Sequence, residues 1–419
     1  MMNTGDLYNL TKSPPIKSTQ ELRKISTAYF KDLEASSNDT NQNIAWCSSV
    51  GPAELLLALG FKVYYPENHT AMLGTSRLAN KYIPAAIAQG YSPEICSYLT
   101  SDIGAFLHGE TPFTKAYGLK EVPKPDVLAF NTNQCRDVQD WFNWYSKKLN
   151  VPIIGINSPS FVDEVKENHI HSVVTQLKDM IPVLEKISDQ SFEKKKLENT
   201  VNLSFQCSET WQEVLETAKA TPSPITFWDS CIHMLPAVVL RGSQIAIDYY
   251  KMLKEELIER IDNNEAAVPN EKFRIYWEGM PIWGKIRPLS EQLYDSQTSV
   301  VASTYCSSWV FTDLGSSTNE PFTNMAKAYT KLFINRSESS KEDYLIDKFK
   351  TFNIDGVIFH NARTCPNNSN TNYGMPKRLE NRQNIPSIVI DADLNDLNVY
   401  SEEQTKTKID AFVEQLAGV

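Results

Sequence analysis

Two cysteines of this 419-residue chain stand in matching surroundings. Cys135 closes the stretch FNTNQC after the apolar run 127–129, and Cys365 closes FHNARTC after the apolar run 356–358. Short apolar runs of this kind are typical of buried strands, and open α/β sheets bind ligands beyond the carboxyl ends of their strands. The sequence therefore predicts that both thiols lie at a ligand site.

A third cysteine, Cys96 in SPEICSYLTSDIGA, lies near the start of an expected helix. The positive end of that helix favours a thiolate. Three thiolates that converge from two domains fit an iron–sulfur cube better than a catalytic dyad. Three ligands, instead of the usual four, would leave one iron open to water or substrate. The alternative is three buried structural thiols, because the spacings match no compact C-x2-C pattern.

Two histidines are candidate proton donors to a reduced substrate, since the charge of histidine changes near neutral pH. His360 precedes Cys365 by five positions, and His233 lies in HMLPAVVLRGSQIA. For either residue a core or surface histidine is the commoner case and the competing interpretation.

The run NNSNTNYG offers amide and hydroxyl donors just after Cys365, above all Asn368 and Ser369. Hydrogen bonds from such donors to cluster sulfurs would raise the reduction potential. An ordinary Asn-rich turn is the competing interpretation.

The stretch GMPIWGKI, residues 279–286, resembles a phosphate-binding loop but fails as one. Ile286 occupies the position of the hydroxyl that binds Mg²⁺, and Pro281 has no N–H for a phosphate. We expect this turn to form a wall of the site, with Glu278 and Trp283 as candidates to face it.

These residues need a scaffold that repeats itself. Three segments of the chain each occur twice, and the two sets follow the same order. Each copy contains an apolar strand pattern, and helical patterns alternate with the strands. This is typical of parallel sheets covered on both faces. The three pairs are 44–66 and 273–303, 125–135 and 354–365, and 151–159 and 385–393.

The predicted fold is α/β, with two duplicated, doubly wound, flavodoxin-like parallel-sheet domains joined by a helical segment, and a site in the cleft between them. We expect an N-terminal helical arm over 1–40, domains over 41–165 and 269–419, and linking helices over 166–268. The chain is expected to end in an amphipathic helix capped by Ser401.

Composition limits the function classes. The chain is 41% hydrophobic and 22% charged, as in soluble globular proteins, and its net charge of -10 argues against general nucleic-acid binding. It has no apolar run long enough for a membrane span and no apparent signal peptide. We expect a cytoplasmic protein whose seven cysteines are free thiols or metal ligands.

The chain resembles the 2-hydroxyacyl-CoA dehydratase and benzoyl-CoA reductase family over nearly its whole length. The resemblance rests on ICSYLTSDIG, FNTNQC, FWDSCIHMLPAVVLRGSQIA, RIYWEGMPIWGKIRPLSEQL and GVIFHNARTCPNNSN. Residues 222–309 look closer to the larger cluster-binding subunit of ATP-dependent benzoyl-CoA reductases than to the dehydratases.

The resemblance implies a [4Fe-4S] cluster held by the residues that match the family's three cysteines, Cys96, Cys135 and Cys365. It also implies an ATP-hydrolysing iron–sulfur activator that supplies a low-potential electron, and an acyl-CoA substrate. The reaction would be 2-hydroxyacyl-CoA dehydration or benzoyl-CoA-type ring reduction. A second homologous cluster subunit or a second copy of the chain would complete the enzyme.

Two alternatives remain open. A related branch carries an [8Fe-9S] double-cubane cluster on six cysteines and reduces small unsaturated molecules without CoA; Cys47, Cys306 and Cys231 would be the second trio. Cys207 is better explained as a buried thiol, since it lies in a helical pattern. The other alternative is a cluster-free ligand-binding α/β protein.

Overall fold

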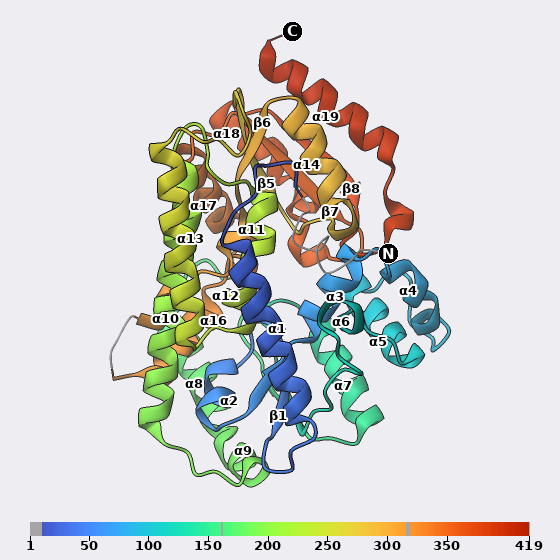
Figure 1. Cartoon of the computed structure of the whole chain (residues 1–419), viewed down its shortest axis with the longest axis vertical. Coiled ribbons are helices and arrows are strands. Elements are labelled where there is room, and N and C mark those ends of the chain that lie inside the picture. Colours follow the sequence, from blue (N-terminus) through green and yellow to red (C-terminus); the bar gives the residue numbers. More distant parts are fainter. Residues whose placement is uncertain (1–10, 161, 316–318, 419) are drawn as a thin grey trace.

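The computed structural model describes residues 11–160, 162–315 and 319–418. Two parallel sheets of four strands each form its centre (Figure 1). The first sheet has the strand order β2-β1-β3-β4 and the second the order β6-β5-β7-β8. The strands are β1 (Ile44–Cys47), β2 (Lys62–Tyr64), β3 (Val127–Asn131), β4 (Ile153–Ile156), β5 (Phe273–Glu278), β6 (Thr298–Ser303), β7 (Gly356–Ala362) and β8 (Ser387–Ala392).

The two sheets repeat one topology. In each half the first strand pairs with the second and the third, and the fourth lies at the edge beside the third. The central strands β1 and β3 are buried at every position, which explains their continuous apolar sequences. The predicted α/β fold with two flavodoxin-like halves is confirmed, and each repeated segment carries the expected strands.

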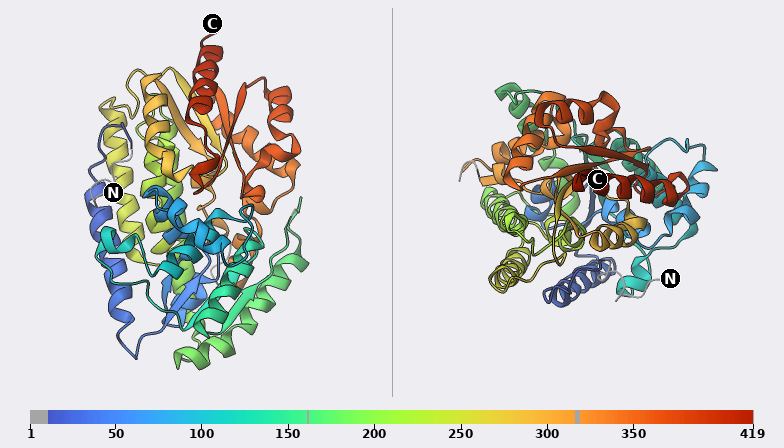
Figure 2. Two further views of the ribbon diagram at one scale, coloured as in Figure 1. Left: turned by 90° about the vertical axis from the view of Figure 1, so that its right-hand side faces the viewer. Right: turned by 90° about the horizontal axis from the view of Figure 1, so that it is seen from above.

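Helices pack around both sheets (Figure 2). Those between β1 and β4 are α2 (Ala53–Ala58), α3 (Pro66–Thr75), α4 (Ala79–Ile87), α5 (Ser97–His108), α6 (Phe113–Tyr117) and α7 (Asp137–Leu149). Between β4 and β5 come α8 (Glu167–Asp179), α9 (Ile181–Ser188), α10 (Lys194–Glu216), α11 (Phe227–His233), α12 (Leu235–Val239) and α13 (Gln244–Asp262). After β5 follow the 3-10 helix η3 (Trp283–Lys285), then α14 (Ile286–Asp295), α15 (Thr304–Ser307), α16 (Pro321–Thr330), α17 (Glu338–Thr351), α18 (Met375–Gln383) and α19 (Glu402–Ala417).

The long helices α10 and α13 pack together along one side of the molecule (Figure 1). Helix α10 contacts α2 of the first half and also α15 and α16 of the second. Its Trp211 is fully buried and donates its ring N–H to the carbonyl oxygen of Cys306, at 3.0 Å. The linking helices therefore hold the two halves together.

Residues 1–10 of the expected N-terminal arm lie outside the described residues, but the arm contains helix α1 (Thr19–Ser36). Its apolar face packs on its own chain: Phe30 stacks on Tyr117 with ring centroids 4.3 Å apart, and the Tyr29 hydroxyl donates to the carbonyl oxygen of Val63. At its start, Glu256 of α13 accepts hydrogen bonds from the backbone N–H groups of Lys17 and Ser18. Helix α1 thus connects the first half to α13.

The C-terminal helix α19 begins as predicted, because the Ser401 side chain accepts a hydrogen bond from the backbone N–H of Gln404. It packs on β8 and extends beyond the second sheet (Figure 2). Within the described parts of the chain, no helix combines the length and apolarity needed to cross a membrane.

Candidate active site

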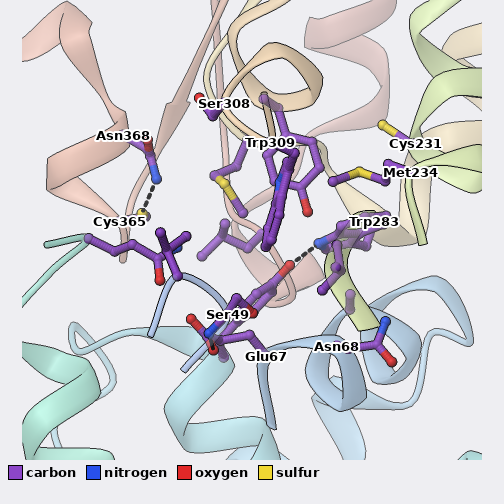
Figure 3. A pocket seen from close by; sticks show the side chains of 18 of the residues that line it. Ser49, Glu67, Asn68, Cys231, Met234, Trp283, Ser308, Trp309, Cys365 and Asn368 are labelled. Carbon is purple, nitrogen blue, oxygen red and sulfur yellow. Dashed lines mark hydrogen bonds between the residues drawn. The ribbon is translucent and has the colours of Figure 1, made fainter. Parts of the chain in front are cut away.

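A cavity of about 210 Å³ lies where the carboxyl ends of the two sheets face each other. Its lining includes residues that come shortly after strands of both halves: Ser49 after β1, Cys135 after β3, Gly279 after β5 and Cys365 after β7. This is the edge of an open α/β sheet at which ligands bind. The predicted cleft between the halves is therefore present (Figure 3).

Cys96, Cys135 and Cys365 all line this cavity. Burial raises the pKa of each thiol, to about 12 for Cys365. A neighbouring cysteine adds to the rise in every case: Cys135 acts on Cys96, Cys365 acts on Cys135, and Cys96 acts on Cys365. The structure thus brings the three thiols of both halves close together, whereas their role as metal ligands stays a prediction.

The start of α5 does not by itself make Cys96 a thiolate. Hydrogen bonds from the backbone N–H groups of Tyr98 and Leu99 do lower the pKa of its thiol. Burial and the neighbouring Cys135 raise the pKa more strongly, so the prediction of a favoured thiolate is wrong for the free thiol. The physical reason is that desolvation of a buried charge outweighs one helix end.

The two polar residues after Cys365 have different roles. Asn368 donates its side-chain N–H to the sulfur of Cys365, at an N···S distance of 3.7 Å, and it lines the cavity. The Ser369 hydroxyl instead bonds to the backbone of Ala362 and to the carbonyl oxygen of Cys365. Asn368 thus contacts the thiol directly, while Ser369 fixes the loop that carries it.

Sequence reasoning missed a carboxyl group in the cavity, that of Glu67 in the first turn of α3. Burial raises the pKa of Glu67 to about 7, although the carboxylate accepts a hydrogen bond of 2.6 Å from the backbone N–H of Ser49. The Ser49 carbonyl oxygen in turn accepts a hydrogen bond from Arg241. The only sequence signal was an acid directly after β2, at a strand end like those of the cysteines.

Neither histidine predicted as a proton donor is among the residues that line the cavity. His233 is 2% exposed, and its ring bonds to the Tyr249 hydroxyl; burial lowers its pKa to about 3. His360 is also buried with a lowered pKa, and its Nδ1 lies 2.6 Å from the carbonyl oxygen of Met280. The structure therefore places both histidines in the core, where an imidazolium is disfavoured.

The other cysteines do not gather into one group. Cys231 lines the cavity, and its thiol is within hydrogen-bonding reach of the buried Cys306. Cys47 is buried at the end of β1, and the charged residues that act on it are Arg241, Glu67 and Glu54. The structure thus brings Cys231 and Cys306 of the suggested second trio together and leaves Cys47 apart. Cys207 is buried in α10, as expected for a structural thiol.

The turn after β5 forms a wall of the cavity, as predicted, through Met280 and Trp283. Trp283 donates its ring N–H to the hydroxyl of Tyr98, which also lines the cavity. Glu278 does not line the cavity but accepts hydrogen bonds from Thr304, which does line it, and from Asn370. Burial raises the pKa of Glu278 to about 7.

Comparison of the sequence with known proteins identifies the family of the chain. Residues 48–416 match the family model described as 2-hydroxyglutaryl-CoA dehydratase, D-component, and the chain belongs to this family. The expected membership of the 2-hydroxyacyl-CoA dehydratase and benzoyl-CoA reductase family is thereby confirmed. The protein is an enzyme component of the dehydratase or reductase type.

Three relatives show the range of the family. The chain is 28% identical to the (R)-phenyllactyl-CoA dehydratase alpha subunit of Clostridium sporogenes, over 95% of each chain. It is 28% identical to the (R)-2-hydroxyisocaproyl-CoA dehydratase alpha subunit of Clostridioides difficile, over 88% of this chain and 89% of the relative. Identity to a benzoyl-CoA reductase subunit of Thauera aromatica is 25%, over 87% of this chain and 86% of the relative. Whole-chain identity to these three relatives thus does not separate the dehydratase subunits from the reductase subunit.

Proposed function

We propose that this chain is the subunit that holds an iron–sulfur cluster through Cys96, Cys135 and Cys365 and acts on an acyl-CoA thioester. The observation that carries the proposal is the meeting of these three half-buried cysteines, from both halves of the chain, in one cavity. Membership of the family supports the thioester as substrate.

The donor set suits a cluster better than a single metal ion. One ion with metal–sulfur bonds of about 2.3 Å would draw its thiolates to within roughly 4 Å of one another. In the described residues no three His, Cys, Asp or Glu side chains are grouped tightly enough to hold an ion. Ligands of a cluster bind different irons and lie farther apart. When bound, a [4Fe-4S] cluster would supply one-electron transfer and an iron without a protein ligand.

The chain's own residues provide the setting for this chemistry. Tyr98, Trp283 and Trp309 wall the cavity with aromatic rings, which exclude water. Glu67 takes up a proton on its carboxylate, which the backbone N–H of Ser49 holds in place. A pKa of about 7 leaves both forms of Glu67 populated near neutral pH, as proton transfer requires.

Dehydration of a 2-hydroxyacyl-CoA is favoured over ring reduction. Residues 48–416 match a family model described as a dehydratase component, 2-hydroxyglutaryl-CoA dehydratase, D-component, which supports dehydration. A thioester carbonyl accepts an electron more easily than a carboxylate, but the barrier is still large. An ATP-hydrolysing iron–sulfur activator is therefore the proposed electron donor.

A partner chain completes the proposed enzyme. The relatives are named as individual subunits of their enzymes, which supports a multi-subunit assembly. A second homologous cluster subunit or a second copy of this chain would take that place, and the proposed compartment is the cytoplasm.

The test is iron and acid-labile sulfide per chain after strictly anaerobic purification, with single Ser substitutions of the three cysteines. We expect about four irons, as for one cubane, and loss of iron in Cys96→Ser, Cys135→Ser and Cys365→Ser. Cys207→Ser, a buried thiol of α10, is the matched control and should keep its iron. About eight irons would favour the double-cubane alternative, and an iron-free protein would overturn the proposal in favour of a cluster-free ligand-binding protein.

A further inference from the structure

One side of the cavity is made of apolar side chains. In Figure 3, Cys365 and Met234 lie on opposite sides, with Trp309 between them. Met234, Leu235 and Val238, from the end of α11 and from α12, all line the cavity. Met234 is 3% exposed and Trp309 is 7% exposed, so this part is shielded from water.

The charged residues of the lining are both acids, Glu67 and Asp137. No Lys, Arg or His is among the described residues that line the cavity. Arg241 lies behind the Ser49 loop, and its nitrogens donate to Glu54 and to the carbonyl oxygens of Ser49 and Gly51. This buried cation is therefore already committed to other partners.

An acyl group that carries a free carboxylate would be placed badly here. Its charge would lose hydration, meet no cation and be repelled by the two acids. A branched aliphatic or aromatic group would instead bury apolar surface against Met234 and Trp309. The charge pattern and the apolar lining thus favour the same kind of substrate.

We propose that the acyl group of the substrate is apolar and uncharged, and that the side of the cavity formed by Met234, Leu235, Val238 and Trp309 binds it. This inference rests on the proposed function and specifies its substrate class. It predicts discrimination against dicarboxylic acyl groups of equal size, whatever the reaction at the thioester.

The test compares 5-methylhexanoyl-CoA with glutaryl-CoA, in which a carboxylate replaces a terminal isopropyl group of similar shape. Binding of each thioester, and of free CoA, is measured anaerobically by calorimetry on the iron-loaded protein. We expect the branched thioester to bind roughly 100-fold more tightly than glutaryl-CoA, since an unpaired buried charge is strongly rejected. Equal or reversed affinities would overturn the apolar acyl group and leave the proposed thioester function intact. If neither thioester binds more tightly than free CoA, the proposed function itself fails.

A variant tests whether the side of the cavity that contains Met234 determines the preference between the two thioesters. Met234→Lys places a cation in the apolar part and should reduce the preference for the branched thioester at least tenfold, on the order expected for pairing a buried charge. Met252→Lys is the matched control, because Met252 is 42% exposed on α13, and it should leave the preference unchanged. An unchanged preference in folded, iron-loaded Met234→Lys would contradict the assignment of this wall. The wild-type comparison decides the proposal even if that variant does not fold.

Discussion

The side-chain amide of Asn368 donates a hydrogen bond to the sulfur of Cys365, at 3.7 Å. A donor of this kind stabilises the more negative, reduced form of a bound cluster. We therefore expect Asn368→Ala to lower the midpoint potential by tens of millivolts, on the order of a fraction of one hydrogen bond to a charged group. A potentiometric titration followed by electron paramagnetic resonance measures the shift. Asn372→Ala, an exposed change in the same loop, should not move the potential.

Glu67 should determine how activity depends on pH. Burial raises its pKa to about 7, so the carboxylate, the proposed proton acceptor in dehydration, becomes populated as pH rises through 7. We expect kcat/KM to rise along a limb with an apparent pKa near 7. Glu67→Gln should remove this limb and lower kcat by roughly 10² to 10⁴. A limb that falls with pH would instead show that Glu67 gives up a proton, as ring reduction requires.

The buried pair of Arg241 and Glu54 should be important for stability. The guanidinium lies 2.9 Å from the carboxylate, and both side chains are at most 2% exposed. Arg241→Met leaves the carboxylate unpaired and should cost about 3–5 kcal/mol of unfolding free energy in a denaturant titration. Arg241→Met combined with Glu54→Leu should cost less, because no charge is stranded. Arg287→Met, the control, breaks the exposed pair with Glu291 and should cost below about 1 kcal/mol of unfolding free energy. An equal loss of unfolding free energy in Arg241→Met and Arg287→Met would contradict this account.

His233 should make the folded state sensitive to acid. Its pKa is lowered to about 3 in the fold, whereas an unfolded histidine binds a proton below about 6.5. Between these two pH values the unfolded chain binds the extra proton, so this residue lowers the unfolding free energy by about 1.4 kcal/mol per pH unit of acidification. His233→Gln should flatten that part of the stability curve. His171→Gln, at an exposed position of α8, should leave the slope as it is.

Much of the fold could be predicted from the sequence because buried parallel strands have a local signature. Strand β3 is buried at all five positions and ends at Asn131, within FNTNQC, and β7 likewise ends at Ala362, within FHNARTC. The same strand-end logic explains why Cys135 and Cys365 were expected at one site. Helix α19 was also predictable, since its Ser401 cap depends only on adjacent residues.

The rest of the site depends on contacts between distant parts of the chain. Glu67 acquires its raised pKa from burial, which no local pattern reveals. Arg241 reaches the Ser49 loop from the linking helices, far along the sequence. His233 is a candidate donor because of its type alone, but its ring bonds to Tyr249 and is not among the groups that line the cavity. Residue type indicated possible chemistry, and only packing decided which groups are available for it.

The three cavity thiols also bear on how the enzyme is made. Cys96 and Cys135 precede the linking helices, whereas Cys365 follows them, so the third thiol leaves the ribosome only after most of the chain has been synthesised. N-terminal segments generally fold first during synthesis. If the proposed cluster is held by all three thiols, it can be completed only when most of the chain has been synthesised, with segments of both halves present. The machinery that would deliver iron and sulfide would then have to recognise an almost complete chain.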